Sequence, residues 1–117
     1  MKPTTRKLLF DIEQACRHIQ DFARGKSIED YETDAYFRSA LDRQFQIAGE
    51  AVARLARADE ETASRISEYR GIVRLRNVIV HGYDAVDPRI LWDIVRNKLP
   101  VLQREVAALL SWPDEEA

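Results

Sequence analysis

The stretch TRKLLFDIEQACRHIQDFAR, residues 5–24, decides the fold class. Apolar side chains recur along it every three or four residues, at Leu8, Ile12, Cys16, Ile19 and Phe22. This period places them on one stripe of an α-helix, which must face a core. Gly25 follows directly and is typical of a helix C-terminus. The sequence therefore predicts an amphipathic first helix.

A second long helix is predicted after a short connection. Ser27 and Asp30 form a capping-box pattern, which indicates a short turn or helix before the long one. The long helix then ends near Ala58, and its apolar positions are Ala40, Leu41, Phe45, Ala48, Val52 and Leu55. Gly49 lies among them and is small enough to let a neighbouring helix approach closely.

Two further helices complete the predicted fold. A charged connection at residues 59–61 leads to a helix over about residues 68–80. Asp87 and Pro88 are an N-cap and first-turn pair that opens the last helix. Pro100 interrupts its apolar pattern, so we expect a kink near residues 97–99, a helix end at Trp112 and Pro113, and a frayed tail over residues 113–117. Trp92 and Trp112 are predicted to be core or interface anchors.

No alternating strand pattern competes with these helices. We therefore expect an all-α fold, an antiparallel helical bundle of four main helices, with a short extra turn or helix after the first and a kinked last helix. The 117 residues, 45% of them hydrophobic, fit a single domain over residues 1–117.

Composition narrows the classes of function. A net charge of -2 and a pI near 5.7 argue against a general nucleic-acid coat, although four arginines between Arg65 and Arg76 make that segment locally basic. The single cysteine, Cys16, is expected to be a buried, reduced thiol, and His18 a surface residue. The short apolar run near the N-terminus is neither a signal peptide nor a membrane span, so we expect a cytoplasmic location and no membrane partner.

The segment Arg76-Asn77-Val78-Ile79-Val80-His81 combines polar groups with an apolar run that is predicted to be buried. Asn77 and His81 are four residues apart and share a helix face, so the amide could orient the imidazole. Arg76 and His81 are five apart and point ~140° away from each other on a straight helix. Either the helix unwinds at His81, or the arginine of one subunit completes a site with the histidine of another.

A histidine beside an arginine suits phosphodiester chemistry. Histidine exchanges protons near neutral pH, and the guanidinium matches phosphate oxygens. RNA carries its own nucleophile, the 2′-hydroxyl, so no metal would be required. A histidine at a helix end is also commonly a cap or a satisfied core residue, so spacing alone leaves the function open.

The run R-N-V-I-V-H-G-Y, residues 76–83, resembles the R-x-x-x-x-H-x-Y signature of HepT-like toxins in the HEPN superfamily. The resemblance continues at Ile72-Val73, at residues 83–87, at Ile90-Leu91-Trp92 and at Leu99-Pro100, and upstream at residues 27–31 and 47–51. It implies an all-helical homodimer whose two motifs line one cleft, and which acts as a metal-independent ribonuclease that arrests growth.

The resemblance also implies the roles of particular residues. Arg76 and His81 would be catalytic, and Asn77 would support them. Tyr83 would be adenylylated by a cognate antitoxin, a minimal nucleotidyltransferase of the MntA type that uses ATP and magnesium itself, while this chain needs no cofactor. Arg70 and Arg74 are candidate contacts to RNA phosphate.

Two other interpretations stay open. The chain could be a non-catalytic helical partner or substrate-binding subunit of a minimal nucleotidyltransferase, or a purely structural helical dimer. The carboxylates Asp11, Glu13 and Glu50 lack the paired carboxylate-histidine spacing of helical metal sites, so we predict no metal in this chain.

Overall fold

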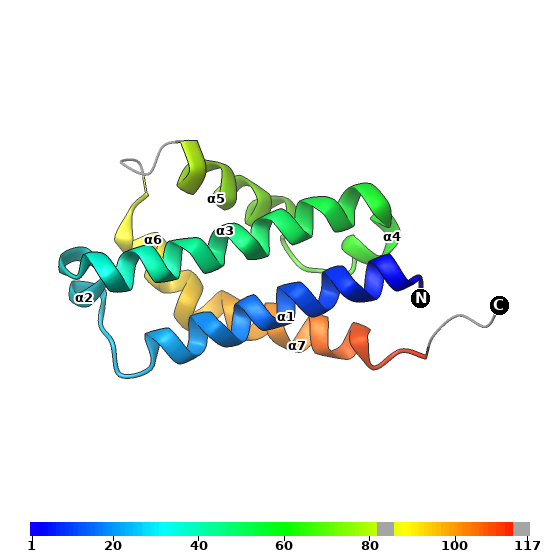
Figure 1. Cartoon of the computed structure of the whole chain (residues 1–117), viewed down its shortest axis with the longest axis horizontal. Coiled ribbons are helices and arrows are strands. Elements are labelled where there is room, and N and C mark those ends of the chain that lie inside the picture. Colours follow the sequence, from blue (N-terminus) through cyan, green and yellow to red (C-terminus); the bar gives the residue numbers. More distant parts are fainter. Residues whose placement is uncertain (82–85, 114–117) are drawn as a thin grey trace.

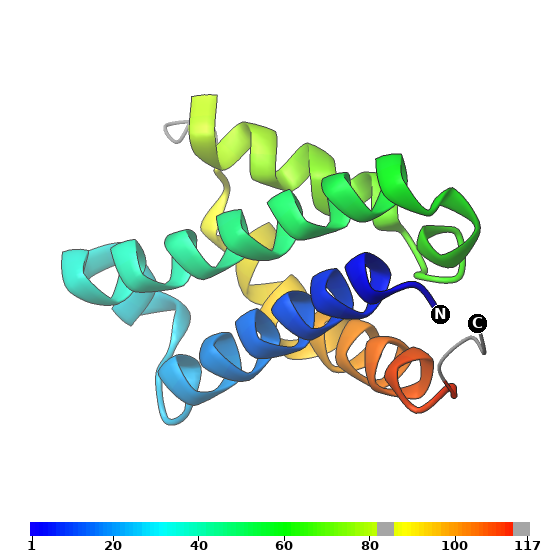
Figure 2. The ribbon, with the colours of Figure 1, turned by 45° about the vertical axis from the view of Figure 1, so that its right-hand side comes forward.

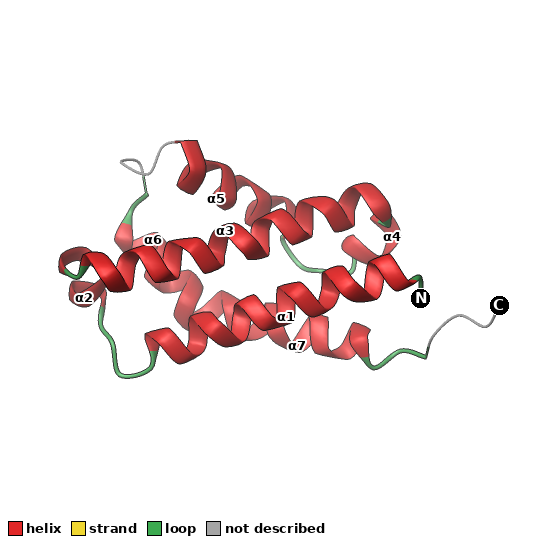
Figure 3. Cartoon of the chain, in the orientation of Figure 1, coloured by secondary structure: helices red, strands yellow, loops and turns green. Residues whose placement is uncertain are grey.

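The computed structural model describes residues 1–81 and 86–113. Its helices are α1 (Pro3–Ala23), α2 (Ile28–Thr33), α3 (Ala35–Ala58), α4 (Glu60–Ala63), α5 (Tyr69–His81), α6 (Pro88–Asp93) and α7 (Leu99–Leu110), and a π-helical segment, η2 (Ile94–Lys98), joins α6 to α7. Over these two ranges every regular element is helical (Figure 3), which confirms the predicted all-α class.

The long helices form an antiparallel bundle (Figures 1 and 2). α1 packs against α3, which runs in the opposite direction, and α7 packs against the other side of α1. α5 runs back along α3, and α6, η2 and α7 form the fourth rod of the bundle. The short helix α2 follows α1, as the sequence predicted.

The core stripe of α1 is as predicted except at its end. Leu8, Ile12, Cys16 and Ile19 are buried, and burial raises the pKa of the Cys16 thiol to about 12. The prediction for Phe22 was wrong, because this ring is exposed and stacks on the exposed His18 ring. At about 100° per residue, Ala23 lies nearer the middle of the stripe than Phe22 does, and Ala23 is buried instead.

Side-chain caps fix the starts of α2 and α3. Ser27 and Asp30 form both hydrogen bonds of the predicted capping box. The carboxylate of Asp34 accepts hydrogen bonds from the backbone N–H groups of Tyr36 and Phe37 at the start of α3.

The helix α4 was not predicted, because a single turn shows no periodicity. Asp59 caps it, and the same carboxylate accepts hydrogen bonds of 2.8 Å from the hydroxyls of Thr62 and the fully buried Thr5. The predicted charged connection is therefore a helical turn, and the hydrogen bond from Thr5 holds it against α1.

The predicted distortion of the last helix takes the form of the π-helical segment η2, which ends at Lys98. There the N–H of Leu99 donates to the carbonyl of Ile94, five residues earlier. Pro100 has no N–H to donate and would crowd an ordinary α-helical turn, and a wider turn relieves both problems. After the end of α7, Trp112 is exposed and lies under the guanidinium of Arg65. The predicted tail lies, from residue 114 on, outside the described residues.

α5 approaches α3 closely at Gly49. A Cβ atom added to Gly49 would overlap the Cβ of Arg76 and come within 3.3 Å of the carbonyl oxygen of Ile72. Gly71 within α5 is different, since an added Cβ would make ordinary contacts of 3.5 Å or more with the Arg74 and Glu68 side chains. Of these two glycines, Gly49 is the one that packing requires.

We therefore expect Gly49→Ala to lower the free energy of unfolding by roughly 1–3 kcal/mol through overpacking. Gly71→Ala should raise it by about 0.5–1 kcal/mol, because alanine loses less backbone entropy in a helix. Urea denaturation of the two variants measures both values. Equal shifts of the same sign would contradict the close approach of the two helices.

Candidate functional site

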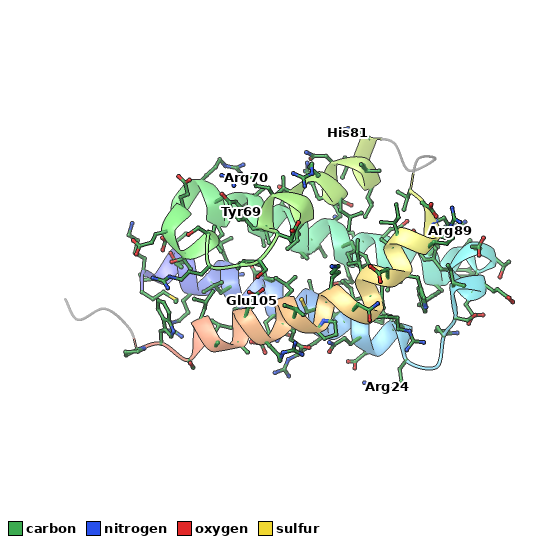
Figure 4. All side chains as sticks on the ribbon, turned by 180° about the vertical axis from the view of Figure 1, so that it is seen from behind. Arg24, Tyr69, Arg70, His81, Arg89 and Glu105 are labelled. Atoms are coloured by element: carbon green, nitrogen blue, oxygen red, sulfur yellow. The ribbon has the colours of Figure 1, made fainter. Side chains whose placement is uncertain are left out.

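The outer face of α5 carries four of the predicted site residues. Asn77, Arg70, His81 and Arg74 fall within a sector of about 60° when each residue turns the helix by about 100°. All four are exposed, and Figure 4 shows Arg70 and His81 on the outer side of the helix. The candidate phosphate contacts therefore share one face with the candidate catalytic histidine.

Arg76 points toward α3 instead. Its Nη2 donates to Glu50 Oε2 on α3 at 2.8 Å, and its Nη1 donates to Asn77 Oδ1 at 2.9 Å. The side chain is 26% exposed, and its Nε is buried without a hydrogen-bond partner in the described part of the chain. Arg76 thus links the motif to α3 while the end of its guanidinium stays accessible.

The prediction that Leu75, Val78, Ile79 and Val80 are buried was wrong in part. Ile79 is buried, but Val78 is 38% exposed and Val80 is half-buried. α5 makes its one extensive helix contact, within residues 1–81 and 86–113, with α3, so only one side of its apolar run is covered.

The structure bears on the two ways of combining Arg76 with His81. α5 continues through His81, so the first alternative, unwinding at this residue, is not observed. The ~140° between the two side chains therefore persists, and one chain alone does not direct both into one small site.

Asn77 is bonded to Arg76 rather than to His81. Its Oδ1 accepts from Arg76, and across the described residues no hydrogen bond joins the Asn77 amide to the His81 imidazole. The exposed His81 ring is free to meet a group from outside the chain. Tyr83 lies outside the described residues.

Glu50 is the site residue that sequence reasoning did not connect to the motif. The hydrogen bond from Arg76 and the charge of that guanidinium lower the pKa of the Glu50 carboxyl. The sequence indicated Glu50 as a conceivable metal ligand and as part of the family-like run at residues 47–51. Because 26 positions separate it from Arg76, no local spacing indicated the pair.

Two hollows flank α5. On the side of Arg76 and Val80, a hollow of about 780 Å³ with both polar and apolar lining lies between α2, α3, the end of α5 and the start of α6. On the side of Ile72 and Leu75, an apolar groove of about 460 Å³ runs between α5 and the η2–α7 rod, with Phe45 of α3 at its floor.

Metal-binding clusters and membrane-spanning helices are both absent from the described residues. No group of three or more histidine, cysteine, aspartate or glutamate side chains there is arranged to hold a metal ion. None of the helices in those residues has the length and apolar character needed to cross a membrane.

Comparison with known proteins identifies the family. The model of the family "Ribonuclease HepT-like" matches residues 12–109. A predicted RNase of Caldanaerobacter subterraneus is 31% identical over 107 residues, which cover 92% of this chain and 95% of the relative. The protein named "Probable ribonuclease HepT" in Thermococcus cleftensis is 31% identical over 103 residues, covering 88% and 93% of the two chains. No solved structure shows significant similarity.

The chain belongs to the HepT-like ribonuclease family, and the expectation drawn from the motif at residues 76–83 is confirmed at this level. Its enzyme class is ribonuclease.

The Glu50–Arg76 ion pair gives a pH-dependent expectation. Because the folded-state pKa of Glu50 lies below its ordinary value of 4.5, the pair stabilises the fold above that value and is lost as the pH falls through the folded pKa. Glu50→Gln should therefore have a lower Tm than the wild type at pH 7, and the difference should shrink in acid.

Thermal unfolding of both proteins between pH 7 and pH 3 tests this expectation. Glu61→Gln is the matched control, because its exposed carboxylate lies 3.8 Å from Arg65 and should contribute less. A Glu50→Gln difference that does not change with pH would contradict the ion pair.

Proposed function

We propose that this chain is the toxin component of a toxin–antitoxin system and a metal-independent endoribonuclease whose nucleophile is the 2′-hydroxyl of RNA. The observation that carries the proposal is the outer face of α5, where His81 lies beside Arg70 and Arg74. An exposed imidazole within a row of exposed guanidinium groups suits a proton-transfer group placed against a phosphate backbone.

The proposed reaction is an internal transfer. The 2′-oxygen loses its proton to a base and forms a bond to the neighbouring phosphorus, while the bond from phosphorus to the 5′-oxygen breaks and that oxygen gains a proton. The products are a 2′,3′-cyclic phosphate and a 5′-hydroxyl. His81 exchanges one of these protons, and Arg76 stabilises the negative charge on the phosphoryl oxygens.

We propose a homodimer as the active form. The divergence of Arg76 and His81 on one helix supports a site in which each chain supplies one of them. The apolar groove beside Leu75 supports self-association, because apolar surface of this kind gains free energy when a second chain covers it.

Purified protein should cleave RNA in excess EDTA and leave 2′,3′-cyclic phosphate ends. His81→Ala and Arg76→Ala should each reduce the rate by at least ~100-fold, since each removes a group that acts on the transition state. Arg24→Ala, which removes an exposed arginine far from α5, is the matched control.

A mixture of the two inactive variants then tests the shared site. If Arg76 of one chain works with His81 of the other, a mixed dimer contains one intact site, and co-refolded Arg76→Ala and His81→Ala should regain activity. An unmodified wild-type protein that cleaves none of several RNAs would overturn the ribonuclease mechanism and favour the non-catalytic partner of a nucleotidyltransferase.

We also propose that a cognate MntA-like nucleotidyltransferase neutralises the chain by adenylylating Tyr83. The family resemblance supports this proposal, as does the position of Tyr83 two residues after His81. An adenylyl group there would place a negative phosphodiester beside the basic face of α5, where it would compete with RNA phosphate.

Intact-mass measurement of the protein co-expressed with its neighbouring nucleotidyltransferase should show added adenylyl groups. Tyr83→Phe should remove them, whereas Tyr36→Phe should not, although Tyr36 is 91% exposed. A neutralised protein without modification at Tyr83 would contradict this form of control.

A further inference from the structure

The hollow between α2, α3, the end of α5 and the start of α6 has the size of a ligand site. Its volume of about 780 Å³ lies within the range of small-molecule sites. It shares Val80 with α5, which places it one residue from His81 and one helical turn beyond Arg76.

Asp42 of α3 is one of the polar groups that line the hollow. Its Oδ1 accepts a 2.6 Å hydrogen bond from the hydroxyl of the buried Tyr31, which fixes the carboxylate in place. Its Oδ2 has no hydrogen-bond partner in the part of the chain that the structure describes. Partial burial raises the pKa of the Asp42 carboxyl, against the opposing effects of the Tyr31 hydrogen bond and the Arg38 charge.

Three more polar side chains of α3 line the same hollow. Ser39, Arg43 and Gln46 lie with Asp42 on one face, at the spacing i, i+3, i+4 and i+7. None of the three forms a hydrogen bond or ion pair with residues 1–81 or 86–113. Arg38 differs, because its Nη1 donates to the carbonyl oxygens of Tyr31 and Glu32 at the end of α2.

The opposite wall of the hollow is apolar. Ile79 and Val80 come from α5, Val86 precedes the N-cap of α6, and Pro88 begins that helix. A flat heterocycle placed between the two walls would contact apolar side chains with its faces and meet hydrogen-bonding groups at its edge.

We infer that this hollow binds a nucleobase of the RNA substrate, and that Asp42 and Gln46 select bases that carry an exocyclic amino group. The amino groups of adenine, cytosine and guanine can donate to the open oxygen of Asp42. Uracil has no amino group, and its one edge donor, the N3–H, lies between two carbonyl oxygens that a carboxylate would repel. Arg43 is placed to contact the attached phosphate. The inference rests on the proposed function, because it assumes that RNA lies along α5.

Nucleotide binding tests the hollow without cleavage. His81→Ala protein, titrated with AMP, CMP, GMP and UMP by NMR, should bind UMP about tenfold more weakly than the other three, the value of one hydrogen bond to a charged group. Adding Asp42→Asn should remove this preference, and adding Gln46→Leu should weaken binding of the amino-bearing nucleotides. Adding Asp21→Asn, remote and exposed, is the matched control.

Tyr31→Phe separates recognition from a purely structural role. It removes the hydrogen bond between α2 and α3 but leaves the carboxylate, so the preference against UMP should persist. If Tyr31→Phe and Asp42→Asn remove the preference equally, Asp42 serves only to hold Tyr31, and the inference is overturned.

Cleavage is the second measurement. Sequencing the ends produced from a randomised RNA should show a bias against uridine beside the cut, and Asp42→Asn should abolish this bias. An unchanged bias in Asp42→Asn, or equal binding of all four nucleotides, would overturn the inference. Selective nucleotide binding without any cleavage would instead contradict the proposed ribonuclease mechanism and leave the subsite standing.

Discussion

The contact between Gly49 and Arg76 is the constraint on which the site depends. Without a side chain at position 49, the backbone of α3 lies against the stem of Arg76, and the adjacent Glu50 holds the end of the same side chain. One short stretch of α3 therefore sets both the distance and the rotation of α5. The rotation decides what faces outward, because turning the buried Ile79 inward leaves His81, Asn77, Arg74 and Arg70 on the opposite side.

This rotation also places different kinds of side chain on the two flanks of α5. Polar groups of α3 and the end of Arg76 lie on one flank, and the apolar side chains Ile72 and Leu75 lie on the other. A nucleic acid offers charged phosphates and base edges for contact, whereas the centre of a protein–protein interface buries apolar area. α5 could therefore face RNA on the flank with polar groups and a second subunit on the apolar flank.

The sequence predicted the helices that carry a periodic apolar pattern or a capping motif, and it failed for features that show no periodicity. The apolar stripes of α1 and α3 and the capping box at Ser27 carry strong local signals, and the structure confirms them. Phe22, Val78 and the turn α4 were misjudged, because burial at a helix end or on a helix with one neighbour depends on where the neighbours stop. The motif at residues 76–83 was recognised from the sequence alone.

The ion pair between Arg76 and Glu50 could not be predicted from the sequence. It joins two helices that are distant in sequence, and only their packing brings the two charges together. The open oxygen of Asp42 was equally hidden, since it depends on the place of Tyr31 in the fold.

The dependence of α5 on a single neighbour has a consequence for local stability. α1 is covered by both α3 and α7, whereas α5 makes its one extensive contact, among the described helices, with α3. Regions with few buried contacts open at a lower free energy than the global transition. The backbone amides of α5 should thus exchange with solvent before those of α1, and we expect the helix that bears the motif to open locally at a lower free energy than the rest of the bundle.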